Sequence, residues 1–152
     1  MRDQFTKHGL VLENALAYWI HRVYQASRNE MFRTFREEGE EITPEQWIVL
    51  VRLWERDGQT QTELGASTYR DRPTMSRILD GMERRKLLQR RADAESGRVW
   101  RVHLTAHGKN LRKKLVPKAQ QIVERTQRGI SEKDLRTTRE TLGRMFANLS
   151  DS

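Results

Sequence analysis

The chain has 152 residues, no cysteine and a formal net charge of +8. This length fits a single domain, residues 1–152. Leu, Ile, Val and Phe account for 33 residues, only just above the ~20% of the chain below which disorder becomes common. We therefore expect a modest core, with some apolar surface left for a partner chain to cover. The lack of cysteine excludes a disulfide scaffold, an iron–sulfur cluster, cysteine-ligated zinc, thiol catalysis and thiol redox sensing.

Membrane and export signals are not evident in the sequence. No stretch reaches the ~18 consecutive apolar residues of a membrane span, and the first residues do not lead into the apolar run of a signal peptide. We therefore expect a soluble, cytoplasmic protein with no membrane partner.

The basic charge is concentrated in the middle of the chain. Residues 60–115 contain fourteen Lys and Arg against six Asp and Glu, a surplus of eight that equals the whole net charge. A basic centre between neutral flanks is typical of a surface that binds phosphate. The alternative is a solvated basic surface without a partner.

The first part of the chain is predicted to be helical. Residues 8–36 have apolar side chains at helical spacing and no proline. Thr43-Pro44-Glu45-Gln46 predicts a capped start for a second helix, which ends at Asp57-Gly58. Thr60-Gln61-Thr62-Glu63 repeats this capping pattern and opens a short helix that runs to about Thr68.

A further helix and a hairpin follow. Asp71 is the predicted cap of a helix that ends near Lys86. Its apolar stripe consists of Met75, Ile78, Leu79 and Met82. The apolar period then changes from 3.6 to 2, so residues 88–93 and 99–104 are predicted strands around an Ala94-Glu95-Ser96-Gly97 turn.

Two helices are predicted in the last third of the chain. Thr105 caps a long helix that runs to about Arg128, and Pro117 inside it is expected to kink or split it. Gly129 ends this helix, and Ser131 starts the last one. The terminal helices carry apolar stripes without any element of their own to cover them.

This order predicts a mostly α-helical fold with a small β-hairpin: a winged helix-turn-helix over about residues 42–104, flanked by helices in 1–38 and 105–152. The uncovered apolar stripes of the first and last helices suit dimerisation. In such a unit the second helix of the pair enters the major groove, and the hairpin, or wing, reaches the neighbouring backbone or minor groove.

The predicted recognition helix has a polar face opposite its apolar stripe. Thr74, Ser76 and Arg77 are candidates for reading bases, because hydroxyls and Arg near the start of such a helix suit base edges. Arg70 and Arg72 precede them and can reach phosphates beside the helix N-terminus. Arg84 and Arg85, further along, are expected to contact the DNA backbone. A solvated surface charge is the alternative for each Arg alone.

The wing is also rich in arginine. Arg98, at the hairpin tip, is best placed to enter a minor groove. Arg90, Arg91 and Arg101 are expected to contact phosphate or to pair with the acids of the wing, and an Asp93–Arg98 pair is expected to fix the turn. The alternative is that these charges protect a strand edge.

From Ile42 to about Leu115 the chain resembles the MarR family of bacterial and archaeal transcriptional regulators. The matching segments are ITPEQWIVLVRL (Ile42–Leu53), TQTELG (Thr60–Gly65), RPTMSRILDGMERRKLLQRR (Arg72–Arg91) and the wing pattern D-x4-R-x5-LT-x2-G that starts at Asp93. The resemblance implies a homodimer in which two recognition helices read a pseudo-palindrome with half-sites ~10 bp apart. Two positions depart from the family pattern. Lys86 stands where the family has Gly, and the wing tip reads Ala-Glu-Ser-Gly.

The resemblance also implies a small aromatic or phenolic ligand bound between the dimerisation helices and the winged part. Side chains that could line such a pocket are Trp19, His21, Tyr24, Trp47 and Trp54. Aromatic residues at helical spacing are more often part of a core. His103 and His107 span a strand end and a helix start, and without cysteine a zinc site is not expected. No cofactor is expected.

An enzyme is the competing class of function. The central region lacks clustered carboxylates for a nuclease metal, a phosphate-binding glycine loop and a nucleophilic serine turn. The family resemblance implies instead a sequence-specific, homodimeric DNA-binding regulator, a repressor relieved by a small ligand, and this is the function that we predict. The alternative is a winged-helix protein that acts as a non-specific DNA-binding protein or a protein-interaction adaptor, although an adaptor has no need of an Arg-rich recognition face.

Overall fold

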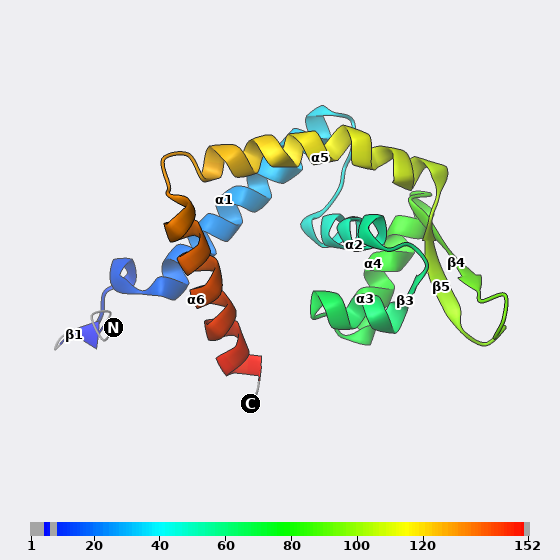
Figure 1. Ribbon diagram of the computed structural model, residues 1–152, viewed down its shortest axis with the longest axis horizontal. Helices are drawn as coiled ribbons and strands as arrows, with labels where there is room; N and C mark the ends of the chain where they lie inside the picture. The colour runs from blue at the N-terminus through cyan, green and yellow to red at the C-terminus, as the bar shows by residue number, and fades with distance from the viewer. Residues whose placement is uncertain (1–4, 7–8, 151–152) are drawn as a thin grey trace.

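The computed structural model describes residues 5–6 and 9–150. The helices are η1 (Leu12–Asn14), α1 (Leu16–Glu37), α2 (Pro44–Glu55), α3 (Gln61–Thr68), α4 (Arg72–Arg84), α5 (Ala106–Thr126) and α6 (Glu132–Ser150). The strands are β1 (Phe5–Thr6), β2 (Gly9–Leu10), β3 (Gln59–Thr60), β4 (Leu88–Ala92) and β5 (Trp100–Leu104). In Figure 1 the compact part formed by α2, α3, α4 and the β4–β5 hairpin lies at one end, the terminal helices lie at the other, and α5 spans both. The predicted fold class, mostly α with a small wing, is confirmed.

Side-chain caps set the starts of the helices. Thr43 and Thr60 each form the complete capping box that the sequence predicts, with the side chains of Gln46 and Glu63 returning to the cap backbone. In the same way the Thr105 hydroxyl accepts from the Gly108 N–H at 3.1 Å. These caps satisfy N–H groups that have no partner inside the helix, which is why the boundaries could be predicted from local sequence.

The three-stranded sheet has the order β3-β5-β4 and is antiparallel throughout. In the hairpin, Leu88 pairs with Leu104 and Ala92 pairs with Trp100. β3 joins the other side of β5, with Gln59 opposite Val102. Strand β3 has only two residues, too few to produce a detectable apolar period.

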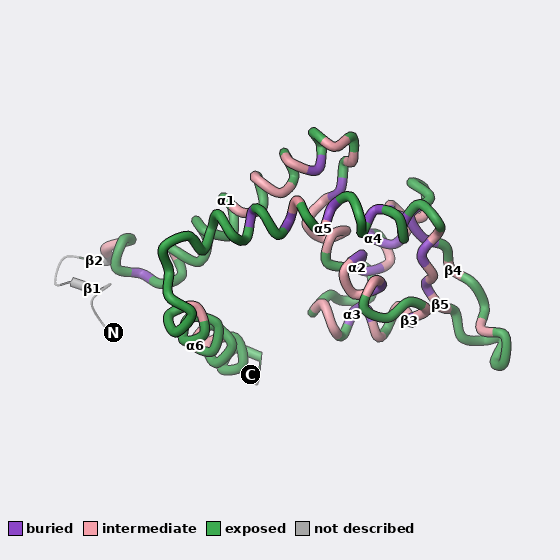
Figure 2. Tube along the Cα trace, turned by 45° about the horizontal axis from the view of Figure 1, so that its top comes forward, coloured by how far each residue is buried: buried purple, intermediate pink, exposed green. Residues whose placement is uncertain are grey.

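The core lies almost entirely in the winged part (Figure 2). Its most buried side chains come from α2, α3, α4 and the hairpin, joined by residues of α1 and α5; the largest are Phe35, Ile42, Leu50, Leu53, Leu64, Met75, Leu79, Met82, Leu87, Leu88 and Leu115. In contrast, α6 has no buried residue within the described part of the chain, and α1 has only Phe35. The terminal helices therefore expose their apolar stripes.

Two features of the long helices differ from the sequence-based expectations. The first helix begins at Leu16 instead of residue 8, because Ala15 has extended backbone angles and the preceding η1 turn is held by the Trp19 indole, which donates to the Glu13 carbonyl at 2.8 Å; residues 7–8 lie outside the described residues. Of the two outcomes expected at Pro117, a kink or a split, the split does not occur, because α5 continues through it. Pro117 and Lys113, whose carbonyl loses its helical partner, are both exposed, so water can satisfy that carbonyl.

Within the residues that the structure describes, no helix has the length and hydrophobicity needed to cross a membrane.

Candidate nucleic-acid interface

Helix α4 presents the predicted recognition face. Its four predicted core residues are all buried, so the helix has one fixed orientation on the winged part. Arg77 and Arg84 are exposed on the opposite side, and Thr74 and Ser76 lie half-buried at its edge. Asp71 caps the helix, and the Thr74 backbone N–H that donates to it at 2.8 Å holds the pKa of that carboxyl below its ordinary value.

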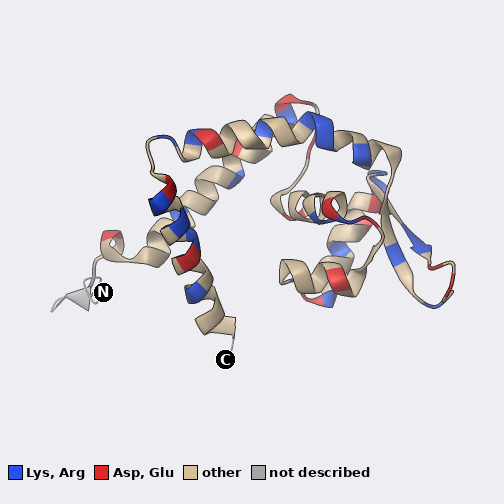
Figure 3. Cartoon of the chain, in the orientation of Figure 1, with Lys and Arg blue, Asp and Glu red and all other residues tan. Residues whose placement is uncertain are grey.

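Arginine side chains on and around this face have no ion-pair partner within the described part of the chain. Among the described residues, none of the ion pairs involves Arg70, Arg72, Arg77, Arg84 or Arg98. All five are exposed. Lys and Arg recur along α4, the hairpin and the first half of α5 (Figure 3). A guanidinium without an intramolecular partner can bind a phosphate or a base without first breaking an ion pair.

Arg85 and Arg90 differ from these five arginines, because both have partners within the chain. Arg85 donates to the Glu41 carbonyl and to the Gln46 side chain at 3.3 Å, which binds it to the start of α2. Arg90 pairs with Asp80 and, at 2.8 Å, with Glu83, both on α4. The Glu83 carboxylate also accepts from the Arg90 backbone N–H at 3.0 Å, and this bond, followed by the guanidinium, lowers the pKa of Glu83. Arg90 therefore joins the wing to the recognition helix.

The predicted Asp93–Arg98 pair was wrong, because Asp93 pairs with Arg101 instead. Arg101 lies opposite Arg91, two residues before Asp93 on the same face, so Asp93 and Arg101 are diagonal neighbours across the hairpin. The Asp93 carboxylate also accepts from the backbone N–H of Glu95 at 2.8 Å. The Arg101 guanidinium and the turn N–H groups together lower the pKa of Asp93 to about 2. Arg98 remains exposed at the tip.

The turn between α4 and the wing has Lys86 at the position where the family has glycine. Lys86 adopts a left-handed conformation with φ +57°, and the Leu87 N–H donates to the Met82 carbonyl at 3.0 Å. The Lys86 carbonyl accepts from the Thr105 hydroxyl at 2.6 Å. Gly108 closes this junction, because a Cβ there would lie 2.1 Å from the Leu87 carbonyl oxygen. The Thr and Gly of the wing pattern thus have a structural role.

A groove of about 700 Å³ lies between the α3–α4 turn and the wing. The residues that line it include Gln61, Thr62, Arg70, Arg72, Arg98 and Trp100. Sequence reasoning did not single out Trp100 or Gln61. Trp100 lies on the same strand face as the buried Val102 and Leu104, a position that indicates a core residue, yet its side chain is 59% exposed.

The five residues predicted to share a ligand pocket do not meet in this chain. Trp47 and Trp54 line a hollow of about 630 Å³ between α2 and α5. Trp19 and Tyr24 line a separate groove of about 520 Å³ between α1 and α6. His21 is exposed and lines neither. Within one chain the α1 residues and the α2 residues therefore line different hollows, and the predicted ligand site remains a prediction.

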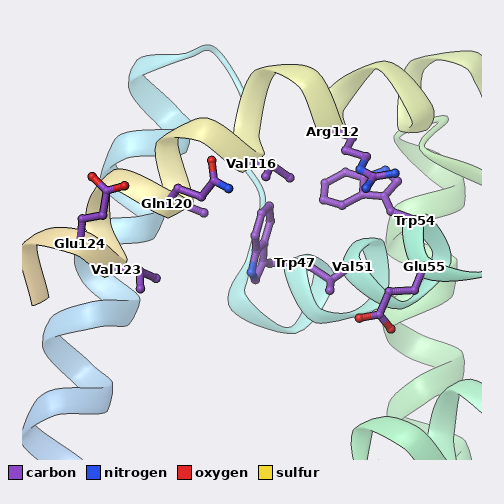
Figure 4. Close-up of a pocket in the computed structure, with 10 residues that line it drawn as sticks. Trp47, Val51, Trp54, Glu55, Arg112, Val116, Gln120, Val123 and Glu124 are labelled. Carbon is purple, nitrogen blue, oxygen red and sulfur yellow. The ribbon is translucent and has the colours of Figure 1, made fainter. Parts of the chain in front are cut away.

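Aromatic and charged side chains line the hollow between α2 and α5. Trp47 and Trp54 rise from α2 towards α5, where Val116 and Arg112 face them (Figure 4). The two indoles meet edge to face with centroids 5.5 Å apart. The Trp54 N–H donates to the Gly108 carbonyl at 2.9 Å, which fixes that ring.

Metal ligands are not clustered in the described part of the chain, where no group of three or more His, Cys, Asp or Glu could hold an ion. His103 lies 3.9 Å from Asp57, and His107 lies 3.9 Å from Glu40, so the two imidazoles face different carboxylates.

Comparisons with known proteins agree with this architecture. Residues 42–100 match the model of the MarR family. An organic hydroperoxide resistance transcriptional regulator of Bacillus subtilis is 31% identical over 107 residues, which cover 69% of this chain and 70% of the relative. The crystal structure of a probable transcriptional regulator from Pseudomonas aeruginosa superposes with a TM-score of 0.79 at 27% identity, over 89% of this chain and 99% of that one.

A further structure shares the fold at lower identity. The S. aureus MepR–DNA complex superposes with a TM-score of 0.79 at 24% identity, over 90% of this chain and 98% of that one. The residues that match the family model contain α2, α3, α4 and β4 and end at the first residue of β5. The chain therefore belongs to the MarR family and is a DNA-binding transcriptional regulator built on a winged helix-turn-helix.

Proposed function

We propose that the protein is a homodimeric repressor that binds a pseudo-palindromic DNA site and is released from it by a small aromatic ligand. The observation that carries the DNA-binding mode is the outward face of α4. It presents Thr74, Ser76 and Arg77 between cations that have no ion-pair partner among the described residues. The acid on this helix face, Asp80, is neutralised by Arg90.

Each side chain has a proposed role. Arg77 makes a bidentate contact with a guanine, and the Thr74 and Ser76 hydroxyls contact neighbouring bases. Phosphates are held by Arg70, Arg72, Arg84 and Arg91. Arg98 enters the minor groove, while Arg90 supports binding by holding the wing against α4. MepR, which has the same fold, forms a complex with DNA, and this supports the same use of the fold here.

The dimer is supported by the exposed apolar stripes of α1 and α6. Leu16, Val23 and Leu142 line the groove between these helices, with exposed fractions of 57%, 54% and 40%. Aliphatic and aromatic side chains line most of the groove, together with three threonines, and none of its lining residues is charged. An apolar surface of this kind is stabilised when a second copy covers it. Two copies would present two recognition helices, and occupation of a promoter by both would repress transcription.

Relief of repression is assigned to the hollow between α2 and α5. Its Trp47 and Trp54 rings suit a flat aromatic molecule, and the Arg112 guanidinium beside them suits a carboxylate or phenolate on that molecule. Helix α5 connects the winged part to the terminal helices. A ligand wedged between α2 and α5 would change the spacing of the two recognition helices and so lower the affinity for DNA.

The test is capture of fragmented genomic DNA by the purified protein at moderate salt, followed by sequencing. We expect a recurring pseudo-palindrome with half-sites ~10 bp apart. Binding without an enriched motif, lost steeply as salt rises, would instead support a non-specific basic protein. Failure to retain DNA at any salt would favour the protein-interaction adaptor.

A further inference from the structure

The groove between the α3–α4 turn and the wing combines cations with one large aromatic ring. Arg70, Arg72 and Arg98 line it, and none of the residues that line it is acidic. Arg72 is the first residue of α4, and Arg98 is at the wing tip. The groove therefore extends from the start of the recognition helix to the end of the wing.

Trp100 is exposed in this groove because of where the wing leaves the core. It is the first residue of β5 and lies on the same strand face as Val102 and Leu104, which are 1% and 4% exposed. Its cross-strand neighbour is the small Ala92. The strand face that is buried at the base of the wing thus continues past the end of the core, and Trp100 stands there 59% exposed.

Duplex geometry indicates what crosses this groove. Adjacent major and minor grooves are separated by a single sugar–phosphate strand. When α4 lies in the major groove and the wing tip in the neighbouring minor groove, the strand between them must run between α4 and the wing. That strand offers phosphate charge to the arginines and apolar deoxyribose carbons to an indole.

We propose that this groove holds one sugar–phosphate strand of duplex DNA, with the Trp100 ring against a deoxyribose, Arg70 and Arg72 at the flanking phosphates, and Arg98 at the edge of the strand where it enters the minor groove. The inference rests on the proposed DNA-binding mode and adds Trp100 as a binding residue. Since deoxyribose is the same at every base pair, Trp100 strengthens binding to all duplexes and does not select a sequence. Its contribution is apolar, so it does not release counterions.

The test is a titration of the variants Trp100→Ala and Arg70→Ala with the captured duplex and with a mixed-sequence duplex at several salt concentrations. Trp100→Ala should weaken both complexes by a similar factor, about tenfold, the scale of burying one exposed aromatic face. The slope of log affinity against log salt should stay unchanged for Trp100→Ala. For Arg70→Ala it should fall by about 0.9, as expected for one lost phosphate contact on B-DNA.

Two further variants make the test specific. Trp100→Phe should retain most of the affinity while losing the DNA-dependent change in tryptophan emission. Ile130→Ala, which removes a 49% exposed apolar side chain from the loop after α5, should bind as the wild type does. Wild-type affinity of Trp100→Ala on both duplexes would overturn the strand contact while leaving the proposed function intact. If the wild type binds neither duplex, the proposed function and the strand contact both fail.

Discussion

Lys86 adopts a backbone conformation that is unfavourable for any residue with a Cβ. At φ +57° a non-glycine residue loses about 1–2 kcal/mol relative to the right-handed region. Glycine removes that cost, although its freer unfolded chain offsets part of the gain. We expect Lys86→Gly to stabilise the protein by about 0.5–1 kcal/mol, and thermal unfolding should show a midpoint higher by about 2–4 °C per kcal/mol.

Lys86→Ala is the matched control, because it removes the same charge but keeps a Cβ in the left-handed region. It should give no stabilisation. An equal rise in the midpoint for both variants would mean that loss of the basic charge, and not relief of the backbone, is responsible.

Arg77 is the residue expected to distinguish one DNA sequence from another. Its guanidinium is exposed on the outward face of α4, and a bidentate contact with a guanine is worth about 1–3 kcal/mol. Arg77→Ala should lose this amount on the captured duplex and much less on a mixed-sequence duplex, as measured by fluorescence titration. Equal losses on the two duplexes would show that Arg77 holds only phosphate.

For single residues, the sequence predicts burial in the helices better than it predicts partners and exposure in the wing. Met75 and Met82 are buried as their helical spacing predicts, because the helix period alone decides which side faces the core. The partner of Asp93 could not be predicted, since it depends on the strand register. The exposure of Trp100 could not be predicted either, because alternation indicates a face but not where the core ends.

The wing turn is the element whose stability depends most clearly on pH. Asp93 holds the turn through Arg101 and the N–H groups of Glu95 and Ser96. Its pKa is lowered from 3.8 to about 2. A carboxyl with a folded pKa below its unfolded pKa contributes stability above pH 3.8, and that contribution is lost as the pH falls to about 2.

We therefore expect the wild-type wing to loosen over this acidic range, seen as shifts of the Glu95 and Ser96 amide signals in an NMR titration. Asp93→Asn keeps an oxygen for those N–H groups but cannot ionise. Its amide signals should lack the titration that is centred near pH 2 in the wild type. A wild-type midpoint near 3.8 would mean that Arg101 does not stabilise the carboxylate in solution.

At the scale of elements, local signals predicted most of the fold. The capping boxes predict where α2 and α3 begin, and the change of the apolar period from 3.6 to 2 predicts the position of the hairpin. The start of α1 was missed because apolar residues at helical spacing continue into a segment whose backbone is extended at Ala15. Strand β3 was missed because it forms only through pairing with β5, a contact distant in sequence.

The whole molecule consists of a compact winged part and terminal helices that lack a core of their own. Helix α5 and the end of α1, whose Phe35 is in the core, join them. A ring contact between Tyr69, just after α3, and Phe146 of α6 adds a further link, with centroids 4.7 Å apart. The position of the DNA-binding face therefore depends on how the terminal helices are held. This is why the oligomeric state matters for DNA binding.

Val23 is the position from which to test the dimer. It is 54% exposed in the single chain and lines the groove between α1 and α6, so an Asp there can remain hydrated while the chain is alone. In a dimer that covers this groove the carboxylate would be buried without a partner, which costs several kcal/mol. Val23→Asp should therefore reduce the mass measured by light scattering from twice 18.0 kDa to 18.0 kDa.

Loss of the dimer should also weaken binding to the pseudo-palindrome, because two half-sites then bind independently instead of through one linked pair of recognition helices. Gln25→Asp introduces the same charge at an exposed position of α1 outside the groove, and it should leave both the mass and the DNA affinity unchanged. A Val23→Asp protein that remains dimeric would place the interface elsewhere on the surface. A wild-type mass of 18.0 kDa would leave the apolar groove without a second copy, and the two-helix reading of a palindrome would have to be abandoned with it.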